Sequence, residues 1–423
     1  MIKWSRVRLV VSILACEGLF STLRERIQLG AAGRRNEAGC AVPTDLPPLH
    51  DYAGVLHIHS THSDGVGTIR QIAEAGTKAG VDFILMCDHS NLDAIALNED
   101  GWYGKCLVMV GTEVTTDSGH LLAVGVPLQF LPTVDNAEAV QESIIKLGGF
   151  AAIALPCDLK DHWKDFAARL PHVGLEVFNF SAIARNKINV PALALIWRRY
   201  RGNRPMRAFN YVSSRPRREL RLWDEIAKNA WSATPPTKVV GLASLDAHAV
   251  MRFGGKEYPY PTYEEVFGTL RTHIVTKEAL SSGSDRRDRS CPTVDHDIQV
   301  VESSLAAGNA YMAYDNYADS KGFRFWSNNG DGTHCNMGDS VSLKSFDGNG
   351  NRLQLNVTVP ARKGIIRLFR NGKLAGAARS KSASFKCSRP GVYRTEIFLY
   401  RFRIGAVCFG SKPWIFSNPI YVS

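Results

Sequence analysis

Histidines recur at the ends of short apolar segments, and this recurrence limits the folds that are open to the chain. The alternating segment 52–59 carries His57 and His59, and the apolar run 81–87 leads into His89. A spacing of two puts both imidazoles of the first segment on one face of a strand. A short continuous apolar run is typical of a buried parallel strand. We therefore expect parallel strands that carry polar side chains at one end.

The segments around these strands predict an alternation of strands and helices. Thr68 can cap a helix over 69–79, which Gly80 ends, and strand, helix and strand in so short a stretch form a βαβ unit. Further strands are expected over 107–114, 121–126, 150–155, 173–178 and 238–244, and helices over 137–147 and near 190–200, 220–230 and 262–271. This pattern predicts an α/β fold and favours a closed barrel, in which loops at the strand ends converge. An open sheet would show the same local pattern.

The last part of the chain has a different character. Short alternating strands are expected over 353–359, 365–370, 384–387, 392–400 and 404–409. Asn371-Gly372 between two of them is a strong hairpin signal, so this region is predicted to be an all-β, sandwich-like module. The 423 residues then divide into an N-terminal segment and linker (1–50), a barrel (51–310) and the β-module (311–423).

The N-terminus combines positive charge with a short apolar run. Lys3, Arg6 and Arg8 precede the run 9–15, which Cys16 follows. This pattern predicts an export or lipid-anchor signal, hence a membrane tether through Cys16 and a location in the cell envelope or periplasm. The alternatives are that this segment is a disordered tail or that the start of the chain is mis-assigned. In either case the protein would be cytoplasmic. The run is too short for a spanning helix.

Charge and cysteine usage narrow the range of partners. The net charge of +11 suits a small anionic substrate, a nucleic acid or an acidic membrane surface. Arginines and aromatic residues are interleaved over 198–221, as they are in some nucleic-acid-binding segments. We expect instead a solvated loop near the barrel mouth that attracts a small anionic substrate. No Cys-x-x-Cys occurs among the nine cysteines, so neither a zinc ribbon nor a thioredoxin-like site is indicated. Cys87 and Cys106 are expected in the core.

Imidazoles and carboxylates near the expected strand ends make up a candidate metal site. The candidates are His57, His59, Asp64, His89, Glu113, His120, Asp246 and His248. Such clusters hold catalytic divalent metals in proteins. Two cations close together lower the pKa of a bridging water and neutralise charge on a phosphoryl group. The set therefore predicts a hydrolase.

Four motifs resemble those of the PHP (polymerase and histidinol phosphatase) family. They are 56–60 (LHIHS) with 63–65 (SDG), 81–89 (VDFILMCDH), 111–114 (GTEV) with 119–120 (GH), and 245–248 (LDAH). Within the family the chain is most similar to bacterial proteins with a C-terminal β-module, whose ending the segment 413–421 resembles. The resemblance implies a distorted (β/α)7 TIM-like barrel with two or three divalent metals, usually zinc, manganese or iron.

The resemblance also assigns the candidates to individual metals. One metal would take His57, His59, Glu113 and Asp246, a second would take Asp64, His89 and His248, and a third would take Glu113 and His120. The family usually supplies one more histidine in an Ala-His-Pro segment, where this chain has Leu155. Leucine cannot bind a metal, so two metals are the simpler expectation, although Asp158 or His162 could compensate.

The remaining candidates have smaller expected roles. Asp88 is a candidate to orient His89, and His62 is expected at the surface or behind the ligands. No side chain is assigned as a general acid. The β-module is expected to pack against the barrel or mediate association; the residues to inspect for carbohydrate or partner binding are Trp326, Trp414 and Phe416. The histidines expected to be structural are His50, His172, His273, His296 and His334.

These features favour a metal-dependent phosphoesterase that acts on a small phosphorylated molecule or nucleotide through a metal-bound hydroxide. The first alternative is a carboxyl or carbamate ester hydrolase that uses the same metal site. The second is a degenerate barrel that serves as a binding or scaffold protein. A nuclease accessory to a polymerase would need a cytoplasmic location. The sequence names neither the substrate, the native metal nor the oligomeric state.

Overall fold

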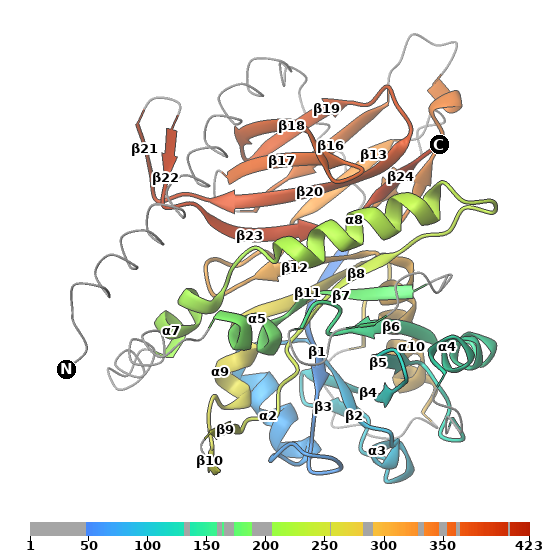
Figure 1. The fold of residues 1–423 in the computed structure, drawn as a ribbon, viewed down its shortest axis with the longest axis vertical. Coiled ribbons are helices and arrows are strands. Elements are labelled where there is room, and N and C mark those ends of the chain that lie inside the picture. Colours follow the sequence, from blue (N-terminus) through green and yellow to red (C-terminus); the bar gives the residue numbers. More distant parts are fainter. Residues whose placement is uncertain are drawn as a thin grey trace.

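The computed structural model describes residues 48–130, 136–158, 163–164, 173–187, 205–253, 255–281, 291–328, 334–346, 353–360, 364–404 and 407–423. Figure 1 shows a lower part, in which helices surround a curved sheet, and an upper part of mostly antiparallel strands. The N-terminal signal-like segment with Cys16, the helix expected near 190–200, His162 and His172 lie outside the described residues. No helix in the described part of the chain is long and apolar enough to cross a membrane.

A mixed sheet forms the lower part, with the strand order β11-β1-β2-β4-β5-β6-β7-β8. Its strands are β1 (His50–Ile58), β2 (Phe83–His89), β4 (Cys106–Thr115), β5 (His120–Val124), β6 (Phe150–Ala154), β7 (Val173–Asn179), β8 (Val240–Ser244) and β11 (Leu270–Thr276). The pairs β1–β2, β2–β4, β6–β7 and β7–β8 are parallel, whereas β1–β11, β4–β5 and β5–β6 are antiparallel. The expected α/β class is confirmed, and the antiparallel pairs are where the regular strand–helix alternation breaks down.

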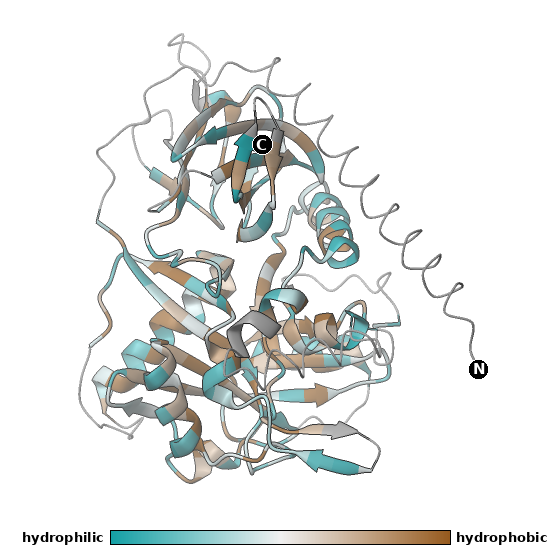
Figure 2. Ribbon diagram, turned by 90° about the vertical axis from the view of Figure 1, so that its left-hand side faces the viewer, coloured by the Kyte–Doolittle hydropathy of each residue, from teal (hydrophilic) through white to brown (hydrophobic). Residues whose placement is uncertain are grey.

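Helices pack around this sheet and its loops. They are α2 (Ile69–Ala79), α3 (Asp93–Ala96), α4 (Ala137–Lys146), α5 (Phe180–Lys187), α7 (Pro205–Val212), α8 (Arg217–Trp231), α9 (Tyr263–Phe267) and α10 (Pro292–Ala307). The predicted limits of α2 are confirmed, since Thr68 forms a capping box with Gln71 and Gly80 is left-handed. Figure 2 shows the hydrophobic colour concentrated on the inner strands, as expected for a sheet covered by helices. Cys87 and Cys106 are buried there, as predicted.

The sheet curls so that the chain after β8 returns to the end of β1. Leu245 N donates to Leu56 O at 3.0 Å, and Ala247 N donates to His57 O at 3.2 Å. His59 N in turn donates to Ala247 O at 3.0 Å. Backbone hydrogen bonds therefore fix the segment that carries Asp246 against the strand that carries the two histidines.

The upper part continues the same sheet. β12 (Ala310–Tyr314) pairs with β11 and with β23 (Lys412–Ser417), beyond which lie β20 (Gly391–Leu399), β24 (Ile420–Val422) and β15 (Ser340–Val341). β17 (Gly364–Arg370) and β18 (Lys373–Ser380) extend from β20. A second sheet contains β14 (His334–Asn336), β13 (Arg324–Asn328), β16 (Gln354–Thr358) and β19 (Ser382–Lys386). Buried side chains of both sheets form one apolar core, as in a sandwich. The domain boundary predicted at 310/311 falls in β12. The remaining small elements are β3 (Gly101–Tyr103), β9 (Met251–Phe253), β10 (Lys256–Tyr258) and the 3₁₀ helix η1 (Leu343–Phe346).

Two predicted elements are wrong. The helix expected over 262–271 ends at Phe267, because the alternating, partly β-branched residues of β11 pair with both β1 and β12. The strand expected over 404–409 is a small hairpin of β21 (Phe402–Ile404) and β22 (Val407–Phe409). The hairpin predicted at Asn371-Gly372 is confirmed, since both residues have positive φ between β17 and β18.

The arginine-rich stretch is not a solvated loop where the structure describes it. Residues 217–231 form α8, and Arg215 just before them donates from Nε and Nη2 to Glu396 of β20 at 2.7 Å each. This ion pair joins the barrel to the β-module. The residues to inspect for carbohydrate or partner binding in the module are all buried: Trp326, Trp414 and Phe416. These three side chains therefore pack the core.

Candidate metal centre

The eight predicted ligands converge at one end of the barrel sheet. His57 and Glu113 lie near the carboxyl ends of β1 and β4, and His89 ends β2. His120 begins β5, and because β5 runs antiparallel to β4 its start lies at the same end. The other members follow β1 or β8: His59, Asp64, Asp246 and His248. The strand ends thus bring together side chains from across almost 200 residues of sequence, as the sequence pattern predicts.

Glu113 lies at the centre of the group. Its Oε2 is 3.1 Å from His57 Nε2, 3.5 Å from His59 Nε2 and 3.2 Å from His89 Nδ1. Its Oε1 is 3.4 Å from His120 Nδ1. One buried carboxylate therefore faces four imidazoles, and each of its oxygens faces a different side of the site.

Two aspartates complete the group. Asp64 Oδ1 lies 3.0 Å from His248 Nε2 and 3.6 Å from His89 Nε2. Asp246 Oδ1 lies 3.6 Å from His59 Nε2 and 3.7 Å from His248 Nδ1. Each carboxylate of the candidate site thus faces ring nitrogens of at least two histidines.

These atoms form two overlapping sets of possible metal ligands. One set contains His59, Asp64, His89 and His248, the other contains His57, His59 and Asp246, and within each set the ligand atoms lie within 4.8 Å of one another. Both ring nitrogens of His59 and Nε2 of His57 are buried without a hydrogen-bond partner of suitable geometry among the described residues. Buried polar atoms normally have partners, and neutral imidazoles with carboxylates are the donors that borderline divalent metals prefer. The buried clusters are therefore compatible with a metal site.

The charges of the site reinforce each other. Burial by itself raises the pKa of the Glu113 carboxyl, but the charge of His57 and its hydrogen bond lower it to about 2. The hydrogen bond from His248 lowers the pKa of Asp64 to about 2. Burial lowers the pKa of His57, yet Glu113 and Glu176 together raise it well above 6.5. The carboxylates are thus ionised at neutral pH, as acidic metal ligands must be.

Glu176, which the sequence did not single out, orients His57. This fully buried residue of β7 accepts a hydrogen bond from His57 Nδ1 at 2.7 Å through Oε1. Its Oε2 accepts from Leu155 N and from Asn179 Nδ2, both at 3.0 Å. With Nδ1 bound to Glu176, the other ring nitrogen, Nε2, faces Glu113 and is the atom available to a metal. A charged residue inside the apolar segment 173–178 was the available signal.

Asp88 does not orient His89 as predicted. Its carboxylate accepts from Ser60 N and Ser60 Oγ at 2.7 Å and from Ser63 Oγ at 2.5 Å. These bonds hold the loop that carries Asp64. Asp88 and His89 are adjacent in a strand, so their side chains point to opposite faces, which explains the error.

The backbone at the site is locally strained. His57, Leu155 and Asp246 have φ values of 63°, 51° and 52°, in the left-handed region that non-glycine residues rarely adopt. Such conformations cost roughly 1–3 kcal/mol each and concentrate at functional sites. Two of these residues are candidate ligands, and the third stands where the resemblance implies a histidine.

Asp158, a proposed substitute for the missing histidine, binds an arginine. Its Oδ2 accepts from Arg185 Nη2 at 3.2 Å and from Arg185 Nε at 3.4 Å. Arg185 Nη1 also lies 3.5 Å from Asp246 Oδ2. No sequence pattern pointed to Arg185, because its partners are distant along the chain. Among the other histidines, His62 pairs with Glu99 near the surface, whereas His273 is buried between Asp51 and Asp315.

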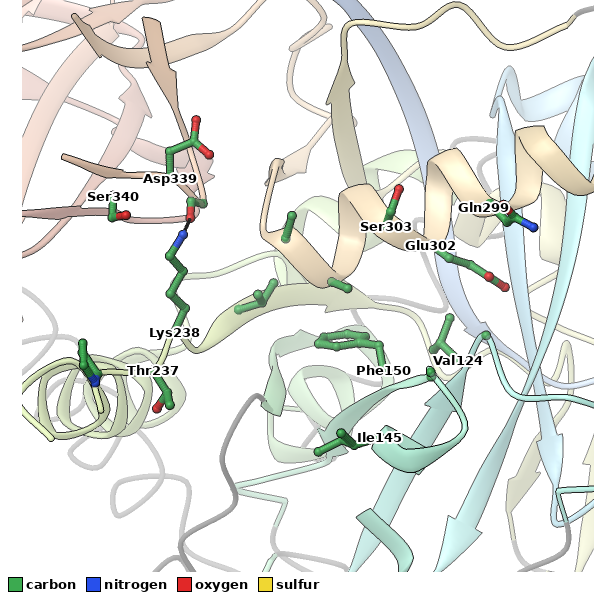
Figure 3. A pocket seen from close by; sticks show the side chains of 18 of the residues that line it. Val124, Ile145, Phe150, Thr237, Lys238, Gln299, Glu302, Ser303, Asp339 and Ser340 are labelled. Carbon is green, nitrogen blue, oxygen red and sulfur yellow. Dashed lines mark hydrogen bonds between the residues drawn. The ribbon is translucent and has the colours of Figure 1, made fainter. Parts of the chain in front are cut away.

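One cavity in the described structure lies away from these ligands. It has a volume of about 830 Å³ and lies between the start of β8, the end of α10 and residues 338–340 (Figure 3). Lys238 lines this cavity, and its Nζ donates to Gly338 O at 2.6 Å. None of the eight candidate ligands lines it. The cavity therefore belongs to the junction between barrel and β-module.

Among known proteins, solved structures resemble the chain at low sequence identity. No protein-family model and no curated protein matches the chain. A two-domain protein from Bacteroides vulgatus that contains a predicted PHP-like metal-dependent phosphoesterase matches with 12% identity and a TM-score of 0.33, over 89% of this chain and 99% of that one. A proposed metal-dependent phosphoesterase from Bifidobacterium adolescentis matches with 12% identity and a TM-score of 0.29, over 48% of this chain and 88% of that one.

Proposed function

We propose that this protein is a metal-dependent phosphoesterase that hydrolyses a phosphate ester of a small molecule or nucleotide. The observation that carries the proposal is the pair of overlapping ligand sets that share the buried His59. Two adjoining groups of imidazoles and carboxylates can hold two neighbouring cations close together. This geometry is the one that paired-metal hydrolysis needs.

The residues have distinct roles in this proposal. His57, His59, Glu113 and Asp246 would hold one cation, Asp64, His89 and His248 the other, and His120 faces Glu113 from the side. The bound cations would supply Lewis acidity, which activates water and neutralises charge on the phosphoryl group. Glu176 fixes the ring of His57, and Asp88 fixes the loop of Asp64. The chain thus supplies both a preorganised ligand set and the contacts that support it.

The test is metal content combined with hydrolysis by the full-length protein. The protein is loaded with Mn²⁺ or Zn²⁺, dialysed, analysed for metal, and assayed with an aryl phosphate and an aryl acetate. We expect about two metals per chain and hydrolysis of the phosphate ester. The variant His59→Ala should lose most of the metal and the activity. His296→Ala is the matched control, because His296 is exposed on α10 and pairs only with Glu278 among the described contacts.

Other outcomes would change the assignment. Metal binding with hydrolysis of the acetate alone would replace the phosphoesterase by a carboxyl ester hydrolase. Absence of metal from the wild-type protein after loading would overturn the proposal in favour of a binding or scaffold role. Equal metal content in His59→Ala and wild type would show that the ligand sets are wrongly assigned.

A further inference from the structure

We infer that the guanidinium of Arg185 supplies the positive charge that a third metal would otherwise provide, and that it binds the phosphate group of a phosphate monoester. The inference rests on the proposed function and adds a substrate-binding residue and a substrate class to it. It starts from the residue at position 155, where leucine replaces the expected histidine.

The place for a third cation lacks ligands. Glu113 Oε1 and His120 Nδ1 remain, 3.4 Å apart. Leu155, next to the residue that pairs with His120 across β5 and β6, is buried and offers no donor atom from its side chain. Its N–H is directed to Glu176. Two protein ligands fall short of the three that open metal sites usually have.

An arginine contacts both Asp158, which follows Leu155 in the chain, and the candidate ligand Asp246. Asp158, only three residues after Leu155, is buried and accepts two hydrogen bonds from Arg185. Arg185 Nη1 lies 3.5 Å from Asp246 Oδ2, whereas Asp246 Oδ1 faces His59 and His248. The Asp246 carboxylate thus contacts the guanidinium with one oxygen and faces two of the histidines with the other. Asp158 Oδ2, at a residue that could have replaced the missing histidine, thus binds Arg185.

Helix α5 is anchored so that Arg185 keeps this position. Ser181 lies one turn before Arg185, on the same face of the helix. Ser181 Oγ donates to Asp246 O at 2.8 Å. Asn179 caps the first turn by accepting from Ala182 N at 2.9 Å, and its Nδ2 donates to Glu176. The helix is therefore tied to both the Asp246 segment and the residue that orients His57.

The guanidinium remains open for a ligand. Its side chain is 47% exposed, whereas those of Asp158 and Asp246 are 1% and 8% exposed. Arginine has five N–H donors; two bind Asp158 and one is directed at Asp246. Two N–H donors therefore remain, on a side chain that is nearly half exposed. A planar guanidinium with two free N–H groups matches the oxygens of a phosphate.

The combination favours a phosphate monoester over a diester. A monoester has three non-ester oxygens and carries up to two negative charges, whereas a diester has two such oxygens and one charge. A metal-binding group together with a fixed guanidinium offers positive charge from two sides. This arrangement suits the ligand with more charge and more oxygens.

Binding of inorganic phosphate to the metal-loaded, full-length protein tests the inference. Wild type, Arg185→Ala, Arg185→Lys and Lys187→Ala are compared by titration calorimetry after their metal content has been measured. Lys187 is the control, because it lies on the same helix, carries the same charge and directs Nζ to Val212 O at 3.2 Å. Arg185→Ala should weaken phosphate binding roughly 10- to 100-fold, as expected for lost charge-assisted hydrogen bonds, with unchanged metal content. The phosphate affinity of Arg185→Lys should lie between those of wild type and Arg185→Ala. Lysine keeps the positive charge but lacks the paired N–H groups of the guanidinium.

Each contrary result has a separate meaning. Unchanged phosphate affinity in metal-loaded Arg185→Ala would overturn this inference and leave the proposed function standing. Loss of metal from Arg185→Ala would show that the arginine supports Asp246 and would also overturn it. A similar loss of phosphate affinity in Lys187→Ala would overturn the inference, because any positive charge on the helix would then have the same effect. A wild-type protein without metal would overturn the inference together with the proposed function.

Discussion

Nδ1 of His57 lies 2.7 Å from Oε1 of Glu176, a residue 119 positions later in the chain. Both side chains are fully buried. The contact holds the His57 ring through Nδ1, whereas Nε2 on the other side of the ring faces Glu113. It therefore links the geometry of the predicted metal centre to a strand that carries none of the eight candidate ligands.

Replacing Glu176 by glutamine should weaken metal binding. The amide can still accept from His57 but lacks the charge that makes the imidazole a stronger ligand, and its NH₂ group would face the N–H donors of Leu155 and Asn179. We expect a roughly 10- to 100-fold loss of metal affinity, measured by competition with a chelator. Glu99→Gln is the control, since Glu99 also bonds a histidine, His62, but away from the ligand sets. Equal affinities for the two variants would contradict a supporting role of Glu176.

The ligands could be predicted from the sequence because each lies in a short local pattern. The two histidines on one face of β1, the aspartate–histidine pair at the end of β2 and the LDAH segment after β8 each combine a strand signal with a metal-binding side chain. Strand ends of a closed or curled sheet converge by geometry. The convergence of these segments therefore needed no knowledge of side-chain contacts.

The supporting residues could not be predicted in the same way. Glu176 and Arg185 meet their partners through the order of strands in the sheet, which local patterns do not reveal. The Asp88 prediction failed because neighbours in a strand point to opposite faces. The helix predicted over 262–271 failed because β11 has partners on both sides. In these cases long-range pairing, rather than local propensity, determined the outcome.

The variant Gly65→Ala should disturb the ligand set that contains Asp64. A Cβ at position 65 would lie 2.2 Å from the carbonyl oxygen of His59, a backbone atom that cannot move without shifting β1 or the loop. We expect loss of one of the two metals per chain, measured by elemental analysis, with little change in the overall fold by circular dichroism. Thr61→Ala in the same loop is the control, because Thr61 is exposed. Retention of both metals in Gly65→Ala would show that the loop can adapt without displacing Asp64.

The variant Trp414→Ala should destabilise the protein without affecting metal content. Trp414 is fully buried in the core of the β-module, and its Nε1 donates to Ala318 O at 2.9 Å. Removing so large a side chain from a core costs about 3–5 kcal/mol, and the carbonyl would lose its partner. Denaturant unfolding measures the loss. Leu374→Ala on β18 is the control, because Leu374 is exposed. A stability equal to that of wild type would show that Trp414 is not a packing residue.

The buried His273 should make stability depend on pH in the alkaline range. Its Nδ1 lies 3.0 Å from Asp51 Oδ1 and its Nε2 lies 3.0 Å from Asp315 Oδ2. Burial lowers the pKa of His273, but the charge of Asp315 and the hydrogen bonds to both acids raise it to about 9. Tyr311 also contacts the ring. A histidine between two carboxylates is therefore charged in the folded protein at neutral pH.

The charged groups around His273 keep their charges over the alkaline pH range in which His273 titrates. Arg324 pairs with Asp51, and Arg271 pairs with Asp315. Both arginines stay charged well above pH 9. Both acids have lowered pKa values, mainly through His273, although burial opposes the shift. Their contribution is complete above the ordinary carboxyl pKa of about 4 and is lost only in acid.

The stability supplied by His273 is fully present below pH 6.5, its ordinary pKa, and is lost as the pH rises through about 9. A shift of this size corresponds to something on the order of 3 kcal/mol. We expect the free energy of unfolding of wild type to fall between pH 6.5 and 9.5, measured with urea at constant ionic strength. His273→Gln should be less stable at pH 6.5 and show a flatter profile, because glutamine cannot carry the charge. His296→Gln, which removes an exposed histidine, should keep the wild-type slope. An unchanged slope in His273→Gln would mean that His273 is neutral in the folded protein.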